Sequence, residues 1–255
     1  MPKTVAIIDG NSLMHRAFHA VPPAMQAPDG TPTNAAFGFL AMLIKFIEEQ
    51  HPDAIVCAFD KGKPAFRMEA LEQYKAQRPP MDDNLRVQFP LIEDLLAALN
   101  IPVVALPGWE GDDILGTLSA QNEKLGYNSL LGTGDKDAYQ LASDLTRIVT
   151  TKKGITDVVV YGPAEVEERY GVTPSQFTDF LGLKGDKADN IPGVPGIGDK
   201  KAAAMLQEFD DLEGIYAHLD AFKGKQLENL TNHKDDAFLS REVATIVRDV
   251  PIEID

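Results

Sequence analysis

Short runs of consecutive apolar residues recur along the first two-thirds of the chain. They cover residues 5–8, 54–59, 102–106 and 129–131. Because these runs do not alternate with polar positions, they predict strands whose two faces are both covered by other elements.

Patterns with the period of a helix separate these runs. They cover residues 34–49, 85–99 and 113–125, and Pro90 is expected to disturb the second. Such alternation of strand and helix predicts the α/β class, with a mainly parallel sheet flanked by helices. From about residue 163 the chain changes to short helical stretches separated by glycine and proline. We therefore predict two domains, residues 1–162 and residues 163–255.

Composition agrees with a globular chain. Its 255 residues, 44% of them hydrophobic, are enough for one large core or for a main domain with a smaller one. The single cysteine, Cys57, lies in the apolar run 54–59, which predicts a buried strand thiol and excludes a disulfide framework. No signal-peptide pattern and no apolar run of about 18 residues is present. We therefore expect a reducing, cytoplasmic setting and no membrane partner.

The formal net charge of −15 argues against a partner rich in phosphate, because an acidic chain repels nucleic acid at long range. Basic residues nevertheless gather in one stretch of the sequence. They are Lys61, Lys63, Arg67, Lys75, Arg78 and Arg86. A solvated helix face would account for this stretch equally well, so charge alone does not decide the partner.

Acidic residues follow each of the four predicted strands. They are Asp9, Asp60, Glu110, Asp112, Asp113, Asp135 and Asp137. Because the carboxyl ends of parallel strands meet at one edge of a sheet, we expect these seven carboxylates to converge there. The alternative for Asp112, Asp113 and Asp135 is an ordinary place at a helix N-terminus, which favours acids.

A converging cluster of carboxylates repels itself and requires a cation. Oxygen ligands without histidine or cysteine are typical of Mg²⁺ or Mn²⁺ rather than of zinc. Two such ions, about 4 Å apart, activate a water and stabilise the leaving oxygen of a phosphodiester. Competing phosphoryl-transfer motifs are missing: there is no Walker-type phosphate loop, and Asn11 stands where an aspartyl-phosphate motif has its second aspartate.

The helical region contains a Gly-apolar-Gly turn, Gly196 and Gly198 around Ile197, that opens a helix. This is the helix-hairpin-helix pattern: glycines allow close approach, and the helix N-terminus offers N–H groups to a phosphate. Lys200 and Lys201 add positive charge beside it. Such a motif binds the backbone of duplex DNA without reading bases. An ordinary tight turn between packed helices is the alternative.

Two further acids, Asp186 and Asp189, stand just before this turn. Their spacing of three makes them neighbours if the segment is helical. We interpret them as metal ligands supplied by the second domain, and simple helix caps as the alternative.

Five segments of the chain resemble one family closely. They are residues 5–18, 66–80, 108–115, 132–141 and 183–202. The resemblance is to the 5′-nuclease domain of bacterial DNA polymerase I and, more distantly, to phage and eukaryotic flap endonucleases. It implies a PIN-like core, a helical arch at about residues 62–86, and a helix-three-turn-helix that binds duplex DNA and a potassium ion. It also implies nine acids that ligate or support two metal ions: Asp9, Asp60, Glu110, Asp112, Asp113, Asp135, Asp137, Asp186 and Asp189.

The same resemblance gives the basic stretch a role in the arch. It implies that Lys75 and Arg78 meet the scissile phosphate as catalytic residues and that Tyr74 stacks on the unpaired terminal base. On a continuous helix Arg67, Tyr74 and Arg78 would lie within about 40° of one another. Arg16 is expected to contact phosphate. Arg67 is a candidate DNA contact, with a structural ion-pairing role as its alternative.

We therefore predict a structure-selective 5′-3′ exonuclease and flap endonuclease that leaves 5′-phosphates during primer removal and DNA repair. Its partners would be 5′ flaps, nicks, 5′ ends of duplex, RNA-primed ends and a covalently linked polymerase, in the bacterial cytoplasm at the nucleoid. A PIN-type ribonuclease would share the acids but needs no duplex-binding hairpin. A non-catalytic DNA-binding module would keep the hairpin and lose acids.

Overall fold

The computed structural model describes residues 2–151 and 157–252 and divides into two compact units. The first unit comprises Met1–Lys63, Pro80–Tyr161 and Val247–Asp255. The second comprises Pro64–Pro79 and Gly162–Ile246. Each unit is therefore assembled from segments that are distant in the sequence.

The first unit is built on a six-stranded sheet with the order β3-β2-β1-β4-β5-β6. Its strands are β1 (Thr4–Asp9), β2 (Ala54–Ala58), β3 (Val103–Val104), β4 (Asn128–Gly132), β5 (Thr146–Thr151) and β6 (Val158–Tyr161). All neighbours are parallel except β5 and β6, which pair antiparallel. The predicted mainly parallel sheet is confirmed.

Each of the four predicted apolar runs contains a strand, but β3 is only two residues long. Strands β5 and β6 were not predicted from the sequence. Polar and apolar residues mix in β5, so it lacks the continuous apolar run of a strand covered on both faces. Strand β6 is a short apolar run of four residues, and it pairs antiparallel at the edge of the sheet.

The helices of the first unit are α1 (Gly10–Ala20), α2 (Asn34–Gln50), α4 (Asp83–Arg86), α5 (Phe89–Ala98) and α6 (Gly111–Lys124), with a 3₁₀ turn, η1 (Asp137–Leu141). The single helix expected over residues 85–99 is two helices, α4 and α5. Pro90 lies in the first turn of α5, where its missing N–H costs nothing, so the break falls just before it.

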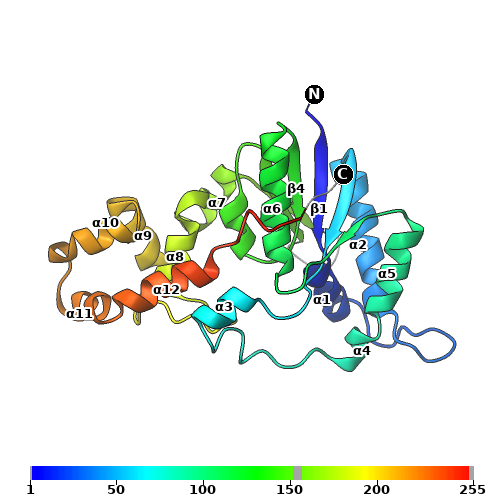
Figure 1. The fold of residues 1–255 in the computed structure, drawn as a ribbon, viewed down its shortest axis with the longest axis horizontal. Coiled ribbons are helices and arrows are strands. Elements are labelled where there is room, and N and C mark those ends of the chain that lie inside the picture. Colours follow the sequence, from blue (N-terminus) through cyan, green and yellow to red (C-terminus); the bar gives the residue numbers. More distant parts are fainter. Residues whose placement is uncertain (1, 152–156, 253–255) are drawn as a thin grey trace. The chain divides into compact units, whose positions relative to one another are not determined.

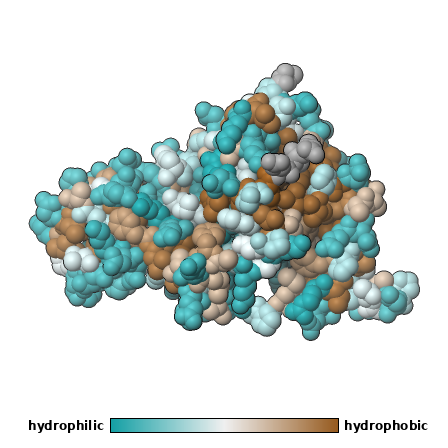
Figure 2. Space-filling model, in the orientation of Figure 1, coloured by the Kyte–Doolittle hydropathy of each residue, from teal (hydrophilic) through white to brown (hydrophobic). Residues whose placement is uncertain are grey.

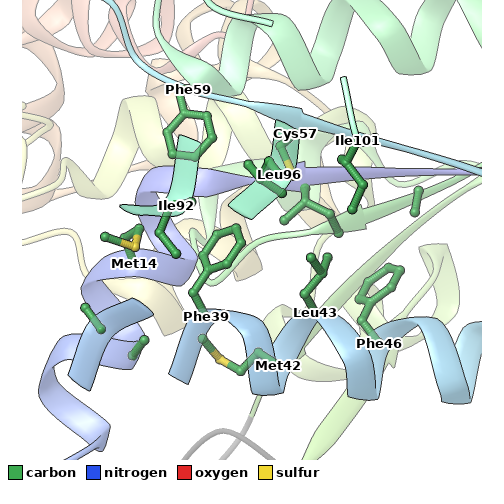
Figure 3. Packing of buried hydrophobic residues seen from close by; sticks show 14 of the residues in the cluster. Met14, Phe39, Met42, Leu43, Phe46, Cys57, Phe59, Ile92, Leu96 and Ile101 are labelled. Carbon is green, nitrogen blue, oxygen red and sulfur yellow. The ribbon is translucent and has the colours of Figure 1, made fainter. Parts of the chain in front are cut away.

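The main core lies between the sheet and the helices α1, α2 and α5 (Figure 3). Phe39 and Leu43 of α2 and Leu96 of α5 are fully buried in it, together with Cys57 of β2. Burial raises the pKa of the Cys57 thiol to about 12, so the thiol stays protonated and behaves as an apolar group. The prediction of a buried strand cysteine is confirmed. Helix α6 packs against β1, β2 and β4, and Figure 1 shows β1 between α6 and α2.

The second unit is helical. Its helices are α3 (Ala65–Ala70), α7 (Pro163–Tyr170), α8 (Phe177–Lys184), α9 (Asp199–Phe209), α10 (Leu212–Ala217), α11 (Gly224–Asn232) and α12 (Lys234–Ala244), with the 3₁₀ turns η2 (Pro174–Gln176) and η3 (Leu219–Ala221). Helix α8 packs against both α9 and α12. Buried Phe177 and Phe180 contribute to the interior of this unit. The predicted helical character after residue 163 is confirmed.

On the face drawn in Figure 2, hydrophilic side chains alternate with apolar patches. Exposed large apolar side chains include Phe37 and Ile44 on α2. Within residues 2–151 and 157–252, no helix has both the length and the apolar character needed to cross a membrane.

Candidate active site

The acids of the first unit lie at the carboxyl edge of the sheet. Asp9 ends β1, Asp60 follows β2, Glu110 precedes the α6 that follows β3, and Asp135 follows β4. Because β3, β2, β1 and β4 are adjacent and parallel, these positions share one edge. We call this set, with Asp112, Asp113 and Asp137, the acid rim.

Asp9 is the last residue of β1 and the N-cap of α1. It is 6% exposed, and its Oδ1 accepts a hydrogen bond of 2.9 Å from the Ser12 amide, which caps α1. Its Oδ2 accepts one of 2.7 Å from the Thr133 hydroxyl. Burial above all, with a smaller contribution from the negative charges of Asp60 and Asp135, raises the pKa of Asp9 to about 7. The rim thus destabilises its own ionised form.

In the loop after β4, hydrogen bonds to the Thr133 hydroxyl position the acids. The Thr133 hydroxyl, which donates to Asp9, accepts a hydrogen bond of 3.0 Å from the Asp135 amide. The Asp135 Oδ1 in turn accepts 3.0 Å from the Asp137 amide. Gly134 donates its amide to the Ser12 hydroxyl at 2.9 Å. One small network therefore ties the ends of β1 and β4 together.

Asp60 is held on the other side of β1. Its amide donates to Asn11 Oδ1 at 3.0 Å, and its Oδ1 accepts 2.6 Å from the Gly111 amide at the start of α6. Glu110 and Asp113 form a capping box at this helix end, in which Asp113 Oδ2 accepts from the Glu110 amide at 3.3 Å. Asp60 and Glu110 thus reach the rim from neighbouring elements.

Asp113 is fully buried, and both of its oxygens accept backbone hydrogen bonds. Besides the Glu110 amide, the Val247 amide donates to Asp113 Oδ1 at 2.9 Å. These contacts suit an acid that supports the rim rather than one that ligates an ion. Asp112 lies beside it and is half-buried.

The rim carboxylates do not form a complete set of metal ligands among the residues that the structure describes. Across residues 2–151 and 157–252, no group of three or more acids, histidines or cysteines has the arrangement that holds an ion. The carboxylate oxygens of Asp9, Asp60 and Asp135 instead accept the hydrogen bonds described above.

Asp186 and Asp189 belong to the second unit, in a turn rather than a regular helix. Asp186 Oδ1 accepts 2.7 Å from the Ala188 amide, and the turn is closed by an isolated bridge between Asp186 and Ile191. Asp189 is 6% exposed and forms an ion pair with Arg78, and its Oδ2 lies 3.7 Å from Lys75 Nζ. Its expected part as a ligand remains a prediction, and in this structure its charge is paired within the second unit.

The segment expected to form a continuous arch helix does not form one. Helix α3 ends at Ala70, and the chain then runs through turns to Arg78. Lys75 has φ +54, the left-handed region, which no right-handed helix permits. The expected helical face of Arg67, Tyr74 and Arg78 is therefore wrong. Lys75 and Arg78 are instead brought together by their shared partner Asp189.

Arg67 has a structural position that rests on hydrogen bonds to backbone carbonyls, and the ion pair expected as its alternative role stays a prediction. It is 3% exposed, and its guanidinium donates to the carbonyls of Val243 at 2.9 Å and Thr245 at 3.0 Å, at the end of α12. Tyr74 is 5% exposed, with its hydroxyl 3.5 Å from Asp189 Oδ2. A DNA contact by Arg67 and base stacking by Tyr74 do not fit these buried positions.

Arg16 lies on α1, about two turns after Asp9 of the rim. Its Nη2 donates to the Thr151 carbonyl of β5 at 2.8 Å, and the side chain is half-buried. It lines a small hollow with Ser12 and Thr133. A phosphate contact at this position remains a prediction.

The hairpin turn of the second unit has the geometry that its sequence predicts. Gly196 has φ +77, a conformation that favours glycine, whereas Gly198 is the N-cap of α9 in ordinary extended geometry. A Cβ added at Gly198 would meet nothing within 4 Å, so this face is open. Lys200 and Lys201 are exposed, and Lys201 Nζ donates to the Gly196 carbonyl at 3.0 Å.

Sequence reasoning overlooked several residues that position the site. Asn11, Ser12 and Thr133 form hydrogen bonds that position the rim acids and their loops. Asn190 and Gln77 form a hydrogen bond that positions residues 73–78, which we call the basic segment. The signal for the first three is their place directly after a strand, beside an acid. Asn190 and Gln77 are far apart in the sequence, which gives no comparable signal.

Comparison with known proteins places both units in one family. Residues 4–171 match the family model described as 5′-3′ exonuclease, N-terminal resolvase-like domain. Residues 172–255 match the model described as 5′-3′ exonuclease, C-terminal SAM fold. The chain belongs to the 5′-3′ exonuclease family. It is therefore a nuclease of this family.

Curated relatives are DNA polymerases I. The chain is 46% identical to that of Bacillus caldotenax over 255 residues, which is all of this chain and 29% of that protein. It is 40% identical to that of Mycobacterium tuberculosis (strain ATCC 25618 / H37Rv) over 250 residues, 98% of this chain and 28% of that protein. The chain thus spans less than a third of the length of these relatives.

Solved structures show the same fold. Bacteriophage T5 5′-exonuclease with bound zinc aligns with a TM-score of 0.76 and 25% identity, over 95% of this chain and 89% of that one. T5 flap endonuclease, in a pseudo-enzyme-product complex with DNA and metal ions, has a TM-score of 0.77 at 24% identity, with the same coverage. The catalytic core of Rad2 with DNA substrate has a TM-score of 0.62 at 18% identity, over 100% and 79% of the two chains.

Proposed function

We propose that this chain hydrolyses DNA phosphodiesters near 5′ ends, at flaps, nicks and RNA-primed ends, and leaves 5′-phosphates. The acid rim carries the proposal, because carboxylates from four adjacent parallel strands share one edge. The work would serve primer removal and DNA repair, beside a linked polymerase as in the DNA polymerases I that the chain matches. We propose catalysis by residues 1–162 and duplex binding by residues 163–255.

The rim fits a pair of hard divalent cations, Mg²⁺ or Mn²⁺. Its donors are all carboxylate oxygens. The raised pKa of Asp9, caused by burial and by the charges of Asp60 and Asp135, supports this proposal, because a nearby cation would stabilise the ionised carboxylate. Asp9, Asp60, Glu110, Asp112, Asp135 and Asp137 are the proposed ligands, with Asp113 as support and Asp186 and Asp189 as contributors from the second unit. When bound, such ions would supply an activated water and charge stabilisation for the leaving oxygen.

The chain's own residues bind and orient the substrate. Lys75 and Arg78 attract a phosphate and stabilise negative charge that grows on it. Thr133 and Ser12 hold the ends of β1 and β4 in register, so that the rim acids keep a fixed spacing.

The hairpin binds the duplex part of the substrate. The open face at Gly198, the N-terminus of α9 and the exposed Lys200 and Lys201 suit a backbone phosphate. We also propose a potassium ion at this turn, on the family resemblance.

The test is cleavage of a 5′-labelled flap substrate. We expect cutting with Mg²⁺ or Mn²⁺ and none with Ca²⁺ or with chelator. On the same substrate labelled instead at the 3′ end of the flap strand, a phosphatase should shift the labelled product by removing its new 5′-phosphate. Relatives of the T5 type with bound divalent ions support the metal requirement. Full activity in excess chelator would refute the metal-dependent mechanism.

Three control substrates define the specificity. A blunt duplex without a 5′ flap, a single strand of the same sequence and an RNA single strand are compared at equal concentration. We expect the flap to be cut fastest. A preference for the RNA strand would replace the proposal with a PIN-type ribonuclease.

A further inference from the structure

The basic segment of the second unit, residues 73–78, forms hydrogen bonds with the turn at residues 186–193 on both sides of Lys75. Asn190 Nδ2 donates to the Gln73 carbonyl at 2.8 Å, two residues before Lys75. Asn190 Oδ1 accepts from Gln77 Nε2 at 2.8 Å, two residues after it. The Lys75 amide itself donates to the Asp189 carbonyl at 2.9 Å. One asparagine side chain therefore brackets the lysine.

Lys75 needs such fastening because its backbone is in an unfavourable region. Its φ of +54 lies in the left-handed region, where L-residues other than asparagine and aspartate are uncommon. A residue persists there only when surrounding contacts determine it. A free segment would relax to ordinary turn geometry and carry the ammonium group elsewhere.

The turn that provides the fastening is itself rigid. Asp186 and Ile191 exchange backbone hydrogen bonds of 3.0 and 2.7 Å. Gly193 closes the turn, where an added Cβ would come within 2.2 Å of the Gly185 amide. The Gly193 amide donates to the Ser240 hydroxyl of α12 at 2.9 Å. Asn190 has φ +58, which asparagine tolerates better than most residues do.

We propose that Asn190 is a positioning residue that holds Lys75 in its left-handed conformation and so aims its ammonium group at the reacting phosphate. The inference rests on the proposed function of Lys75. Asn190 contacts Gln73 and Gln77, and it acts on the reaction only through the lysine that lies between them.

Asn190→Gly is the main test, because glycine keeps the left-handed backbone and removes both side-chain hydrogen bonds. Single-turnover cleavage of the flap substrate with saturating enzyme in Mg²⁺ should slow about 10-fold, since a displaced catalytic group lowers the rate without removing binding. Affinity for the same DNA in chelator should change less than about 2-fold, within the scatter expected of an uncharged site. Gln77→Ala should show a smaller effect in the same direction. Gln73→Ala is the matched control, because its carbonyl and not its side chain accepts the bond.

A double-mutant cycle separates positioning from general damage. On a Lys75→Ala background, Asn190→Gly should cost almost nothing further, because the group that it positions is gone. An equal loss on both backgrounds would overturn the proposal. So would an unchanged single-turnover rate for Asn190→Gly on the parent background.

Amide hydrogen exchange tests the positioning without activity. Asn190→Gly should speed amide exchange in residues 73–78 and leave amide exchange in α8 unchanged. These exchange rates do not depend on whether the proposed nuclease chemistry is right. Unchanged exchange in residues 73–78 would refute the fastening itself. If the parent protein fails to cut the flap while exchange responds as expected, the proposed function fails and the fastening stands.

Discussion

Asp9 and Asp189 are equally buried, each 6% exposed, yet their surroundings are opposite. Asp9 accepts hydrogen bonds from neutral donors, the Ser12 amide and the Thr133 hydroxyl, and it faces the charges of Asp60 and Asp135. Asp189 is paired with two cations, Arg78 and Lys75. One buried carboxylate therefore resists ionisation, and the other has its charge balanced within its own unit.

The contrast indicates that buried carboxylates have different electrostatic roles in the two units. A rim in which burial and the charges of Asp60 and Asp135 raise the pKa of Asp9 gains from added cations, and it would bind them where substrate phosphates must come. A carboxylate that already pairs with a lysine and an arginine instead fixes where those positive groups point. The first arrangement suits an ion site, and the second suits the placement of catalytic cations.

Asp135→Asn should have the largest effect. It removes one rim charge, while the amide oxygen can still accept the hydrogen bond from the Asp137 amide. We expect single-turnover cleavage in Mg²⁺ to fall by about 10³-fold or more, as for loss of a preorganised electrostatic group. DNA affinity in chelator should be equal or tighter, because one repulsive charge has gone.

Asp144→Asn is its matched control, since this exposed aspartate lies outside the rim. It should leave the rate unchanged. If Asp135→Asn lost DNA affinity in proportion to its rate, the residue would support the fold rather than an ion.

Lys75→Ala should slow cleavage about 10²-fold, because one preorganised positive group near the phosphate is lost. DNA affinity by anisotropy in chelator should fall only modestly, since the hairpin contacts remain. Lys63→Ala, an exposed lysine of the same basic stretch, is the control. A loss confined to affinity would make Lys75 a binding residue and remove the contrast between the two aspartates.

The pKa of Asp9 predicts a pH dependence of stability. Its folded value of about 7 lies above the unfolded value of about 3.9, so between these values the folded state binds more protons. The free energy of unfolding in chelator should therefore fall as pH rises. From pH 5.5 to 7 the loss is about 2 kcal/mol, at about 1.4 kcal/mol per unit.

Urea denaturation in chelator at several pH values measures this change in the free energy of unfolding. Asp9→Asn is the matched variant, because asparagine still caps α1 but does not titrate. In this variant the free energy of unfolding should change with pH much less than in the parent protein. An identical slope in the variant would place the titration elsewhere.

Gly198→Asn should have the smallest effect. The new side chain would occupy the open face at the start of α9 and cap the N–H groups offered to a phosphate. Affinity for duplex-containing substrates should fall about 10-fold, the equivalent of about 1.4 kcal/mol. Slow cleavage at saturating enzyme should persist.

Ala204→Leu adds bulk to an exposed position of the same helix and serves as control. If both variants bound duplex as the parent does, the turn would be structural only.

The parts of the molecule that the sequence predicts are those determined by local pattern. Continuous apolar runs located β1, β2 and β4, and the acids at their ends followed from the parallel sheet. The hairpin followed from two glycines. Local pattern failed at the basic segment, because the left-handed Lys75 depends on Asp189 and Asn190, more than a hundred residues further along.

Arg67 illustrates the same limit. A positive charge in a basic stretch favours a phosphate contact, but its partners are the carbonyls that end α12, 176 residues later at Val243. A sequence pattern records the charge of a side chain and not the carbonyls that it will meet. The buried position of Tyr74 likewise depends on the second unit's interior.

The interleaving of the two units bears on how the chain folds as it is synthesised. Val247 and Val250 donate their amides to Asp113 and to the Thr117 hydroxyl, at 2.9 and 3.0 Å, so the first unit is completed by residues that follow the whole of the second. A growing chain normally folds its early part first. Here Asp113 and Thr117 lack their Val247 and Val250 partners until the 85 residues of Gly162–Ile246 have been synthesised, so the first unit is completed late. Nascent chains arrested at residue 171, where the first family match ends, should therefore remain loosely folded and dependent on chaperones, whereas chains that have exposed residue 252 should become resistant to protease.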